Sequence, residues 1–303
     1  MNKKIVMEYI KNSPSRRSAI KKMAAATVVT MVGNSLLTRL SAAEFDEQLK
    51  GRINHSVCRW CFKDISLDDL CKAAKNIGLT SIELLHPEEW PTIKKYGLTC
   101  ALPRAADMGI QKGFNDPQYH DALVKSYEEV IPKVAAAGFN QIICFSGNRN
   151  GLDDEQGIKN CAVALKRLMP IAEKNKVTVV MELLNSKVNH IDYQCDHTAW
   201  GATLVDTVGS DRFKLLYDIY HMQIMEGDVI ATIRKYNKYI SHYHTAGVPG
   251  RHEIDDTQEL NYPAIMRAIL ETGYKGYVAQ EFIPKRDDKI ASLKQGVQIC
   301  DVT

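Results

Sequence analysis

Four side chains that could hold a cation close four successive apolar runs in the second half of the chain. The runs that begin at residues 177, 213, 240 and 277 end in Glu182, Asp218, His244 and Glu281. A single carboxylate at the end of a strand is usually a solvated strand end or a helix cap, but four in succession indicate a shared site. Three carboxylates and one imidazole without a thiolate favour a hard divalent cation, Mg²⁺, Mn²⁺ or Co²⁺, over a structural zinc ion.

The elements that would position these side chains alternate between short β-branched runs and longer stretches of helical period. We predict eight strands, at residues 53–57, 81–85, 98–102, 141–145, 178–182, 213–218, 240–245 and 277–282. Helical stretches close with Gly78 and Gly138 just before a strand, which is typical C-cap chemistry. Eight βα units in about 260 residues predict a single-domain (β/α)₈ TIM barrel, with an open doubly wound sheet as the alternative. A barrel would bring all four strand ends to one rim.

Other motifs of known chemistry are missing from the sequence. It has no G-x-G-x-x-G after its first predicted strand, no P-loop and no internal repeat, so small-molecule chemistry on one domain is the economical interpretation. Cys58 and Cys61 have the spacing of a redox pair or half a zinc knuckle, but no second such pair follows. We interpret them as buried or loop thiols, with a disulfide between them as the alternative.

The first 43 residues have the three-part layout of a secretory signal. Basic residues precede the apolar run 23–32, and the small residues Ser41, Ala42 and Ala43 follow it. Residues 15–21, Ser-Arg-Arg-Ser-Ala-Ile-Lys, resemble a twin-arginine export signal, although Ala19 stands where that pattern usually has Phe. We therefore expect a signal peptide over 1–43, cleavage after Ala43, export to the periplasm, and a barrel over 44–303. A basic N-terminal arm is the alternative.

Charge and hydropathy exclude several classes of partner for the remaining chain. The signal carries eight of the 39 basic residues and one of the 36 acidic ones, so the part from Glu44 onward has a formal charge of about −4. An acidic surface does not suit nucleic acid. The apolar run in the signal is too short and too interrupted for a permanent membrane span. The assembly state stays open, with a homo-oligomer as one option.

Five motifs in the second half of the chain resemble those of the hydroxypyruvate isomerase family, which belongs to the xylose isomerase-like TIM barrels together with ketose 3-epimerases. They are Glu182–Asn185, Tyr217–Gly227, His244–Glu253, Glu259–Tyr262 and Gln280–Phe282. The likeness covers residues 53–302 in order and spacing. One departure is His244, since bacterial hydroxypyruvate isomerases commonly have Gln there whereas ketose epimerases have His.

The resemblance implies that Glu182, Asp218, His244 and Glu281 bind one divalent cation, with Glu182 and Glu281 also serving as acid and base. It implies an isomerase of a small sugar or hydroxy-keto acid that moves a proton through an enediolate. The alternatives are a ketose 3-epimerase, an inosose dehydratase-like lyase or metal-dependent endonuclease on the same barrel, and a sugar-binding protein without catalysis.

Three further residues are implied or expected at the site. The resemblance implies that His221 and Arg251 contact the oxygens of the substrate; on residue type alone, Arg251 would be a surface side chain and His221 equally a core histidine. We expect Asn185 to support Glu182 rather than to touch the reacting carbons. We also take His242 to face away from His244, so that only His244 is a ligand.

Overall fold

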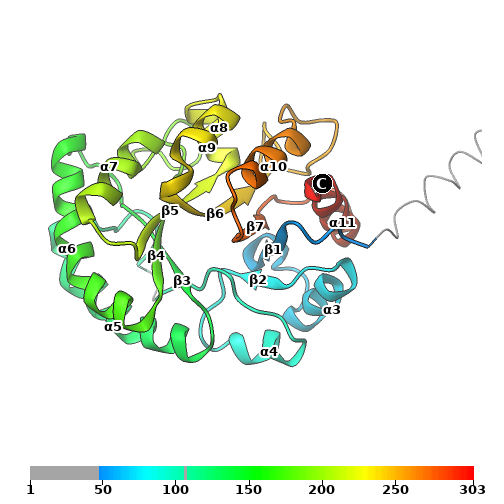
Figure 1. Cartoon of the computed structure of the whole chain (residues 1–303), viewed down its shortest axis with the longest axis horizontal. Helices are drawn as coiled ribbons and strands as arrows, with labels where there is room; N and C mark the ends of the chain where they lie inside the picture. The colour runs from blue at the N-terminus through cyan, green and yellow to red at the C-terminus, as the bar shows by residue number, and fades with distance from the viewer. Residues whose placement is uncertain (1–47, 106–107) are drawn as a thin grey trace, which may run out of the picture. The chain divides into compact units, whose positions relative to one another are not determined.

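The computed structural model describes residues 48–105 and 108–303, and within them a parallel sheet is surrounded by helices (Figure 1). The strands are β1 (Asn54–Cys58), β2 (Ser81–Glu83), β3 (Gln141–Cys144), β4 (Thr178–Glu182), β5 (Phe213–Asp218), β6 (Ile240–Thr245) and β7 (Tyr277–Gln280). They are hydrogen-bonded in the order β2-β1-β7-β6-β5-β4-β3. The four strands that carry the predicted ligands are therefore consecutive neighbours.

The helices alternate with the strands in sequence, α11 following the last strand, and they cover the outside of the sheet. They are α3 (Leu67–Ile77), α4 (Trp90–Lys95), α5 (His120–Ala136), α6 (Asp154–Asn175), α7 (Thr198–Val208), α8 (Ile219–Met225), α9 (Val229–Tyr236), α10 (Tyr262–Glu271) and α11 (Lys289–Cys300), with 3₁₀ turns at Arg59–Phe62, Pro117–Tyr119 and Asn237–Tyr239. Helix α3 shows the local rules: the Ser66 side chain accepts from Asp69 N at its start, and Gly78, at φ 100°, ends it.

The predicted third strand, residues 98–102, is not a regular strand in the structure, but its backbone fills the eighth place. Thr99 O and Leu102 O accept from Ile82 N and Leu84 N on the side of β2, at 3.1 and 2.9 Å. On the other side, Pro103 O accepts from Ile143 N of β3 at 3.1 Å. The ladder is irregular because Pro103 has no N–H and because Ala101 N donates to the Ser81 side chain. The barrel closes, so the TIM-barrel prediction is confirmed and the open sheet is excluded.

The cysteines and the termini bear on the remaining predictions. All eight cysteines are buried free thiols, so Cys58 and Cys61 form no disulfide in this structure and the packing interpretation holds. In the part of the chain that the structure describes, no helix is both long and apolar enough to span a bilayer. The predicted signal, residues 1–43, lies outside the described residues.

The buried hydroxyl of Tyr262 joins α10 to the end of β6 and gives a test of the fold. It donates to Ala246 O at 2.7 Å and accepts from Ala246 N at 2.9 Å. Tyr262→Phe leaves both backbone groups without this partner, so we expect the free energy of unfolding in urea to fall by about 1–3 kcal/mol. Tyr96→Phe is the control, because its hydroxyl bonds the exposed Asp68; it should cost less than about 0.5 kcal/mol. Equal losses in the two variants would contradict the assignment.

Candidate metal centre

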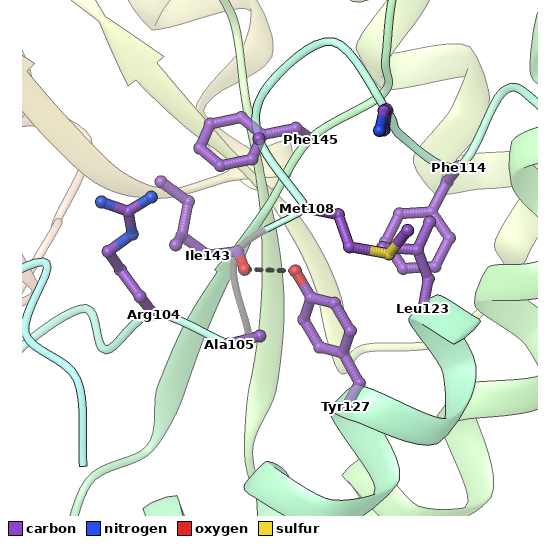
Figure 2. Close-up of a pocket in the computed structure, with 10 residues that line it drawn as sticks. Arg104, Ala105, Met108, Phe114, Leu123, Tyr127, Ile143 and Phe145 are labelled. Atoms are coloured by element: carbon purple, nitrogen blue, oxygen red, sulfur yellow. Dashed lines mark hydrogen bonds between the residues drawn. The ribbon is translucent and has the colours of Figure 1, made fainter. Parts of the chain in front are cut away.

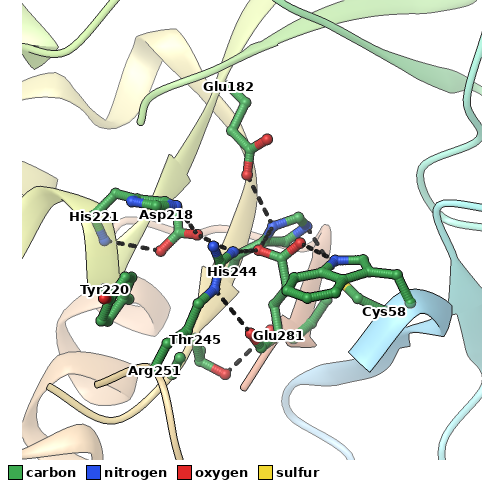
Figure 3. Close-up of polar contacts among 12 residues, drawn as sticks. Cys58, Glu182, Asp218, Tyr220, His221, His244, Thr245, Arg251 and Glu281 are labelled. Carbon is green, nitrogen blue, oxygen red and sulfur yellow. Dashed lines mark hydrogen bonds and ion pairs between the residues drawn. The ribbon is translucent and has the colours of Figure 1, made fainter. Parts of the chain in front are cut away.

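The side chains of Glu182, Asp218, His244 and Glu281 converge at the end of the barrel where their strands finish (Figure 3). One ligand atom from each lies within 4.8 Å of those of the other three. All four side chains are buried, with relative exposures of 5, 1, 0 and 3%. The strands place them in register, since Glu182 pairs with Leu216 and Asp218 pairs with His244.

The imidazole of His244 bridges two groups of acids. Its Nδ1 lies 2.8 Å from Glu281 Oε2 and 3.3 Å from Glu182 Oε1, and its Nε2 lies 2.8 Å from Glu83 Oε1. Burial acts to lower the pKa of His244, but the acidic groups around the ring, Cys58 and Glu281 foremost, raise it well above its ordinary value. The ring is therefore held in one orientation, with Nδ1 toward the two glutamates.

Asp218 both starts a helix and faces the site. Its Oδ1 accepts from His221 N at 3.1 Å and caps α8. Its Oδ2 lies 3.4 Å from an Arg251 guanidinium nitrogen. Burial raises the pKa of Asp218 to about 8, against the opposing charge of Arg251. A carboxylate this deeply buried needs positive charge beside it to stay ionised.

The two glutamates of the site differ in their surroundings. Burial raises the pKa of Glu182, and the charge of Glu281 adds to that. Burial has the same sense at Glu281, but the charges of His244 and Arg251 outweigh it and hold the pKa of Glu281 well below its usual range. Glu182 Oε1 is buried and accepts no hydrogen bond from the described residues, whereas Glu281 accepts from Trp60 Nε1 at 2.8 Å and from Arg251 at 2.5 Å. Of the two glutamates, Glu281 is therefore the one that stays ionised more readily.

The residues present fit a divalent cation. Three buried carboxylates and one imidazole nitrogen surround a common point, and a buried carboxylate oxygen there has no hydrogen-bond donor. Buried anions need compensating charge, and the donors are hard oxygens with one nitrogen, which suits Mg²⁺, Mn²⁺ or Co²⁺. Glu182, Asp218, His244 and Glu281 would hold the ion.

Arg251 reaches the site from a tight loop after β6. Gly247 N donates to His252 O and Arg251 N donates to Gly247 O, both at 2.9 Å. A Cβ on Gly247 would lie 2.4 Å from Glu253 O, so glycine is required there. Arg251 has φ 61°, and its guanidinium lies between the rings of Trp60 and Tyr220, 5.1 and 5.4 Å from their centroids. The side chain is buried in the site rather than free on the surface.

His221 is buried beside Asp218, and Asn185 sets its orientation. Asn185 Oδ1 accepts from the backbone of Val188 and Asn189, so its amide nitrogen donates to His221 Nδ1 at 2.6 Å. Burial and the charge of Arg251 lower the pKa of His221 well below its ordinary value. The neutral ring then carries its proton on Nε2, which lies 3.6 Å from Asp218 Oδ2. Our expectation for Asn185 is corrected: its hydrogen bonds support His221, not Glu182.

Glu83 and His242 complete the surroundings of His244; the sequence did not single out Glu83, and the predicted orientation of His242 is corrected here. His242 shares a face with His244, because residues two apart along a strand point the same way; their rings are 5.3 Å apart. The expectation that they face apart was wrong. Both donate to Glu83 Oε1, His242 at 2.9 Å. The feature of the sequence that could have identified Glu83 is its carboxylate within the mostly apolar run 81–85.

A cavity of about 350 Å³ opens onto the metal centre. Its polar wall carries Glu182, Glu281, Arg251, His190 and Arg104, and its apolar wall carries Trp60, Leu84, Ile110, Ile143, Phe145 and Leu184. A smaller cavity of about 30 Å³ adjoins it and shares Arg104, Ile143 and Phe145 (Figure 2). His190 and Arg104 were not singled out from the sequence, because loop residues carry no periodic signal. The larger cavity has room for a small polar molecule in contact with both glutamates.

Comparisons with known proteins agree with this fold. The family model for the xylose isomerase-like TIM barrel matches residues 71–300. A putative hydroxypyruvate isomerase of Homo sapiens is 26% identical over 244 residues, which cover 75% of this chain and 88% of that protein. The crystal structure of an AP endonuclease, family 2, from Brucella melitensis has a TM-score of 0.71 at 23% identity, over 81% of this chain and 97% of that one. A D-psicose 3-epimerase crystallised in the presence of D-fructose has a TM-score of 0.64 at 16% identity, over 82% and 90%.

Proposed function

The chain belongs to the xylose isomerase-like TIM barrel family, and from that premise we propose that it is a divalent-metal-dependent isomerase of a small hydroxy-keto acid or sugar. It is an enzyme of the isomerase class, as its named relatives are. The observation that carries the proposal is the convergence of Glu182, Asp218, His244 and Glu281 within 4.8 Å at the edge of the cavity. When bound there, a divalent cation would polarise a substrate carbonyl and stabilise the developing oxyanion.

The proton transfer falls to Glu182 in this proposal. An aldose–ketose type of isomerisation moves one proton between neighbouring carbons, while the hydroxyl proton passes to the oxygen of the former carbonyl group. A single carboxylate can take and return the carbon-bound proton, whereas epimerisation needs a group on each face. Glu182 lines the cavity and has an oxygen that accepts no hydrogen bond from the described residues. Glu281 is engaged by Trp60, His244 and Arg251. This difference favours isomerisation over ketose 3-epimerisation, which remains the alternative.

His221 and Arg251 supply polar groups near the reacting oxygens. The Nε2–H of neutral His221 has no hydrogen-bond partner among the described residues, so it can donate to a substrate hydroxyl or enediolate oxygen. Arg251 lines the cavity, and its guanidinium keeps Glu281 ionised while leaving other N–H groups for a substrate oxygen. The apolar wall formed by Leu84, Ile143, Phe145 and Leu184 keeps water from the reacting carbons.

We also propose that residues 1–43 direct export to the periplasm before residues 44–303 act as the enzyme. The support is the sequence alone: the basic start, the apolar run and the small-residue exit. N-terminal sequencing of the protein recovered from the periplasm of a bacterial host would test this. A start near Glu44 is expected, and recovery of the full-length chain in the cytoplasm would contradict it.

Solvent deuterium incorporation tests the proposed reaction class directly. Ketoses, aldoses, inositols and hydroxy-keto acids of three to six carbons would be incubated with the protein and Mn²⁺ or Mg²⁺ in D₂O. We expect product to form, with deuterium at the carbon that receives the proton, for one or a few hydroxy-keto acids or sugars. Tight, metal-dependent sugar binding without any exchange would favour a binding protein over an enzyme.

Trp60→Phe should slow the enzyme without unfolding it. The ring keeps its apolar surface, but the hydrogen bond from Trp60 Nε1 to Glu281 and the better cation–π partner of Arg251 are lost. A hydrogen bond to a charged group contributes about 1.5–3 kcal/mol, so we expect kcat/KM to fall roughly 10- to 100-fold. Trp200→Phe is the matched control, because its Nε1 donates to Asp154 O away from the cavity. Similar rates for the two variants would contradict this role.

A further inference from the structure

A second buried cluster lies against the metal centre on the side of β1 and β2. Glu83 is the last residue of β2, pairs with Cys58 of β1, and is fully buried. Its Oε1 accepts from His244 Nε2 at 2.8 Å and from His242 Nε2 at 2.9 Å, and Cys58 Sγ lies 3.8 Å away. One carboxylate oxygen therefore collects donors from two strands, and one of these donors is a predicted metal ligand.

This arrangement decides which nitrogen of His244 faces the metal centre. A neutral imidazole has one N–H and one lone pair, and its hydrogen-bond partner selects the tautomer. In this structure both ring nitrogens lie against carboxylates, Nε2 against Glu83 and Nδ1 against Glu182 and Glu281. Because Glu83 keeps the proton on Nε2, Nδ1 is the nitrogen whose proton a cation would displace. The orientation is also fixed, because rotation of the ring about its stem would break the contact with Glu83.

His242 restrains Glu83 in turn. Glu83 Oε2 and His242 Nδ1 are buried and have no hydrogen-bond partner among residues 48–105 and 108–303. The position of the carboxylate thus depends on its donors at Oε1. Burial of a carboxylate with so few partners lowers the free energy of unfolding unless its charge interacts favourably with a neighbour. Here the carboxylate of Glu83 lies against Nε2 of His244, the ring nitrogen that points away from the proposed metal centre.

We infer that Glu83, held by His242, is a positioning residue that presents Nδ1 of His244 to a divalent cation. The inference rests on the proposed metal centre and extends it by two residues that touch neither the ion nor the substrate. Outer carboxylates of this kind orient the imidazole and increase its basicity, and their loss typically weakens metal binding about 10- to 100-fold.

The test measures the dissociation constant of Mn²⁺ from the full chain by following free Mn²⁺ in electron paramagnetic resonance spectra. Glu83→Gln keeps the volume and an acceptor oxygen but removes the charge, and we expect it to weaken Mn²⁺ binding about 10-fold or more. His242→Asn should change affinity in the same direction by a smaller factor. The visible absorption of Co²⁺ bound to each variant reports whether the imidazole still coordinates.

Ser56→Ala is the matched control. Ser56 Oγ donates to Ser81 Oγ at 2.9 Å between the same two strands, is fully buried, and does not contact His244. Circular dichroism and thermal unfolding would establish that each variant folds; if Glu83→Gln does not, His242→Asn carries the test. Loss of Mn²⁺ affinity in the Glu83 and His242 variants but not in Ser56→Ala supports the inference.

Two outcomes would overturn the inference, and they differ in what else they affect. If the wild-type chain binds Mn²⁺ and the Glu83 and His242 variants match Ser56→Ala in affinity and Co²⁺ spectrum, the positioning role is wrong while the metal centre stands. If the folded wild-type chain binds neither Mn²⁺ nor Co²⁺, the proposed metal-dependent function fails, and the positioning role fails with it.

Discussion

Glu182→Gln is expected to lower kcat by about 10²–10⁴-fold, the usual contribution of a positioned general base. The amide keeps the shape of the side chain and an oxygen for the cation but cannot take up a proton. The carboxylate it replaces lines the cavity, and its Oε1 accepts no hydrogen bond from the described residues. Turnover and deuterium exchange should therefore fall together, while the unfolding temperature changes little. Steady-state kinetics with the substrate found in the exchange screen would measure the effect.

Glu259→Gln is the control for that substitution. Glu259 lies on the loop after β6, accepts from Gln223 at the surface, and is not among the residues that line the cavity. Its rate should stay close to that of the wild type. If Glu182→Gln kept a near-normal rate, another group would have to carry the proton and the proposed mechanism would be wrong.

Removal of divalent cations by a chelator is expected to abolish turnover, and one equivalent of Mn²⁺ per chain should restore it. Stabilisation of the developing oxyanion is worth several kcal/mol, and each 1.36 kcal/mol is a factor of ten in rate, so a loss of about 10³-fold or more is expected. Addition of the ion at 100 times its dissociation constant stabilises the folded state by about 2.7 kcal/mol. For a domain of this size, that should raise Tm by roughly 5–10 °C.

His244→Ala serves as the control for the metal prediction, because it removes one ligand and leaves the cavity wall intact. It should abolish both the rise in Tm and the restored activity. Full activity in the chelated wild type would contradict the metal-dependent mechanism. More than one tightly held ion per chain would instead favour a metal-dependent hydrolase on the same barrel.

The convergence of Glu182, Asp218, His244 and Glu281 could be predicted from sequence because each ends an apolar run, and parallel strands of a barrel deliver their ends to one rim. The orientation of the imidazole could not, because it depends on Glu83, which is 161 residues away from His244. The partner of Asn185 was missed for a similar reason: its amide is turned toward His221 by two backbone N–H groups of its own loop. Hydrophobic periodicity carries no information about either contact.

The predicted third strand shows where local pattern reaches its limit. Residues 98–102 have the apolar composition of a strand, but Pro103 follows them and the Ser81 side chain takes the N–H of Ala101. A pattern of residue types cannot foresee that a serine from the neighbouring strand will compete for a ladder hydrogen bond. The chain path was predicted correctly, and only the regularity of the pairing was not.

The irregular closure of the barrel lies away from the strands that position the candidate cation ligands, and beside residues that shape the cavity. Strands β4 to β7, which lead to the four proposed cation ligands, are joined by parallel ladders with one shift of register, at Leu215/Leu216. Leu84, Arg104, Ile143 and Phe145, which also line the cavity, lie beside the loosely paired residues 98–103. Substitutions beside residues 98–103 can therefore change the shape of the cavity without changing the spacing of Glu182, Asp218, His244 and Glu281. In descendants of such a chain, we would expect changes of substrate specificity to begin with substitutions beside this irregularly paired segment.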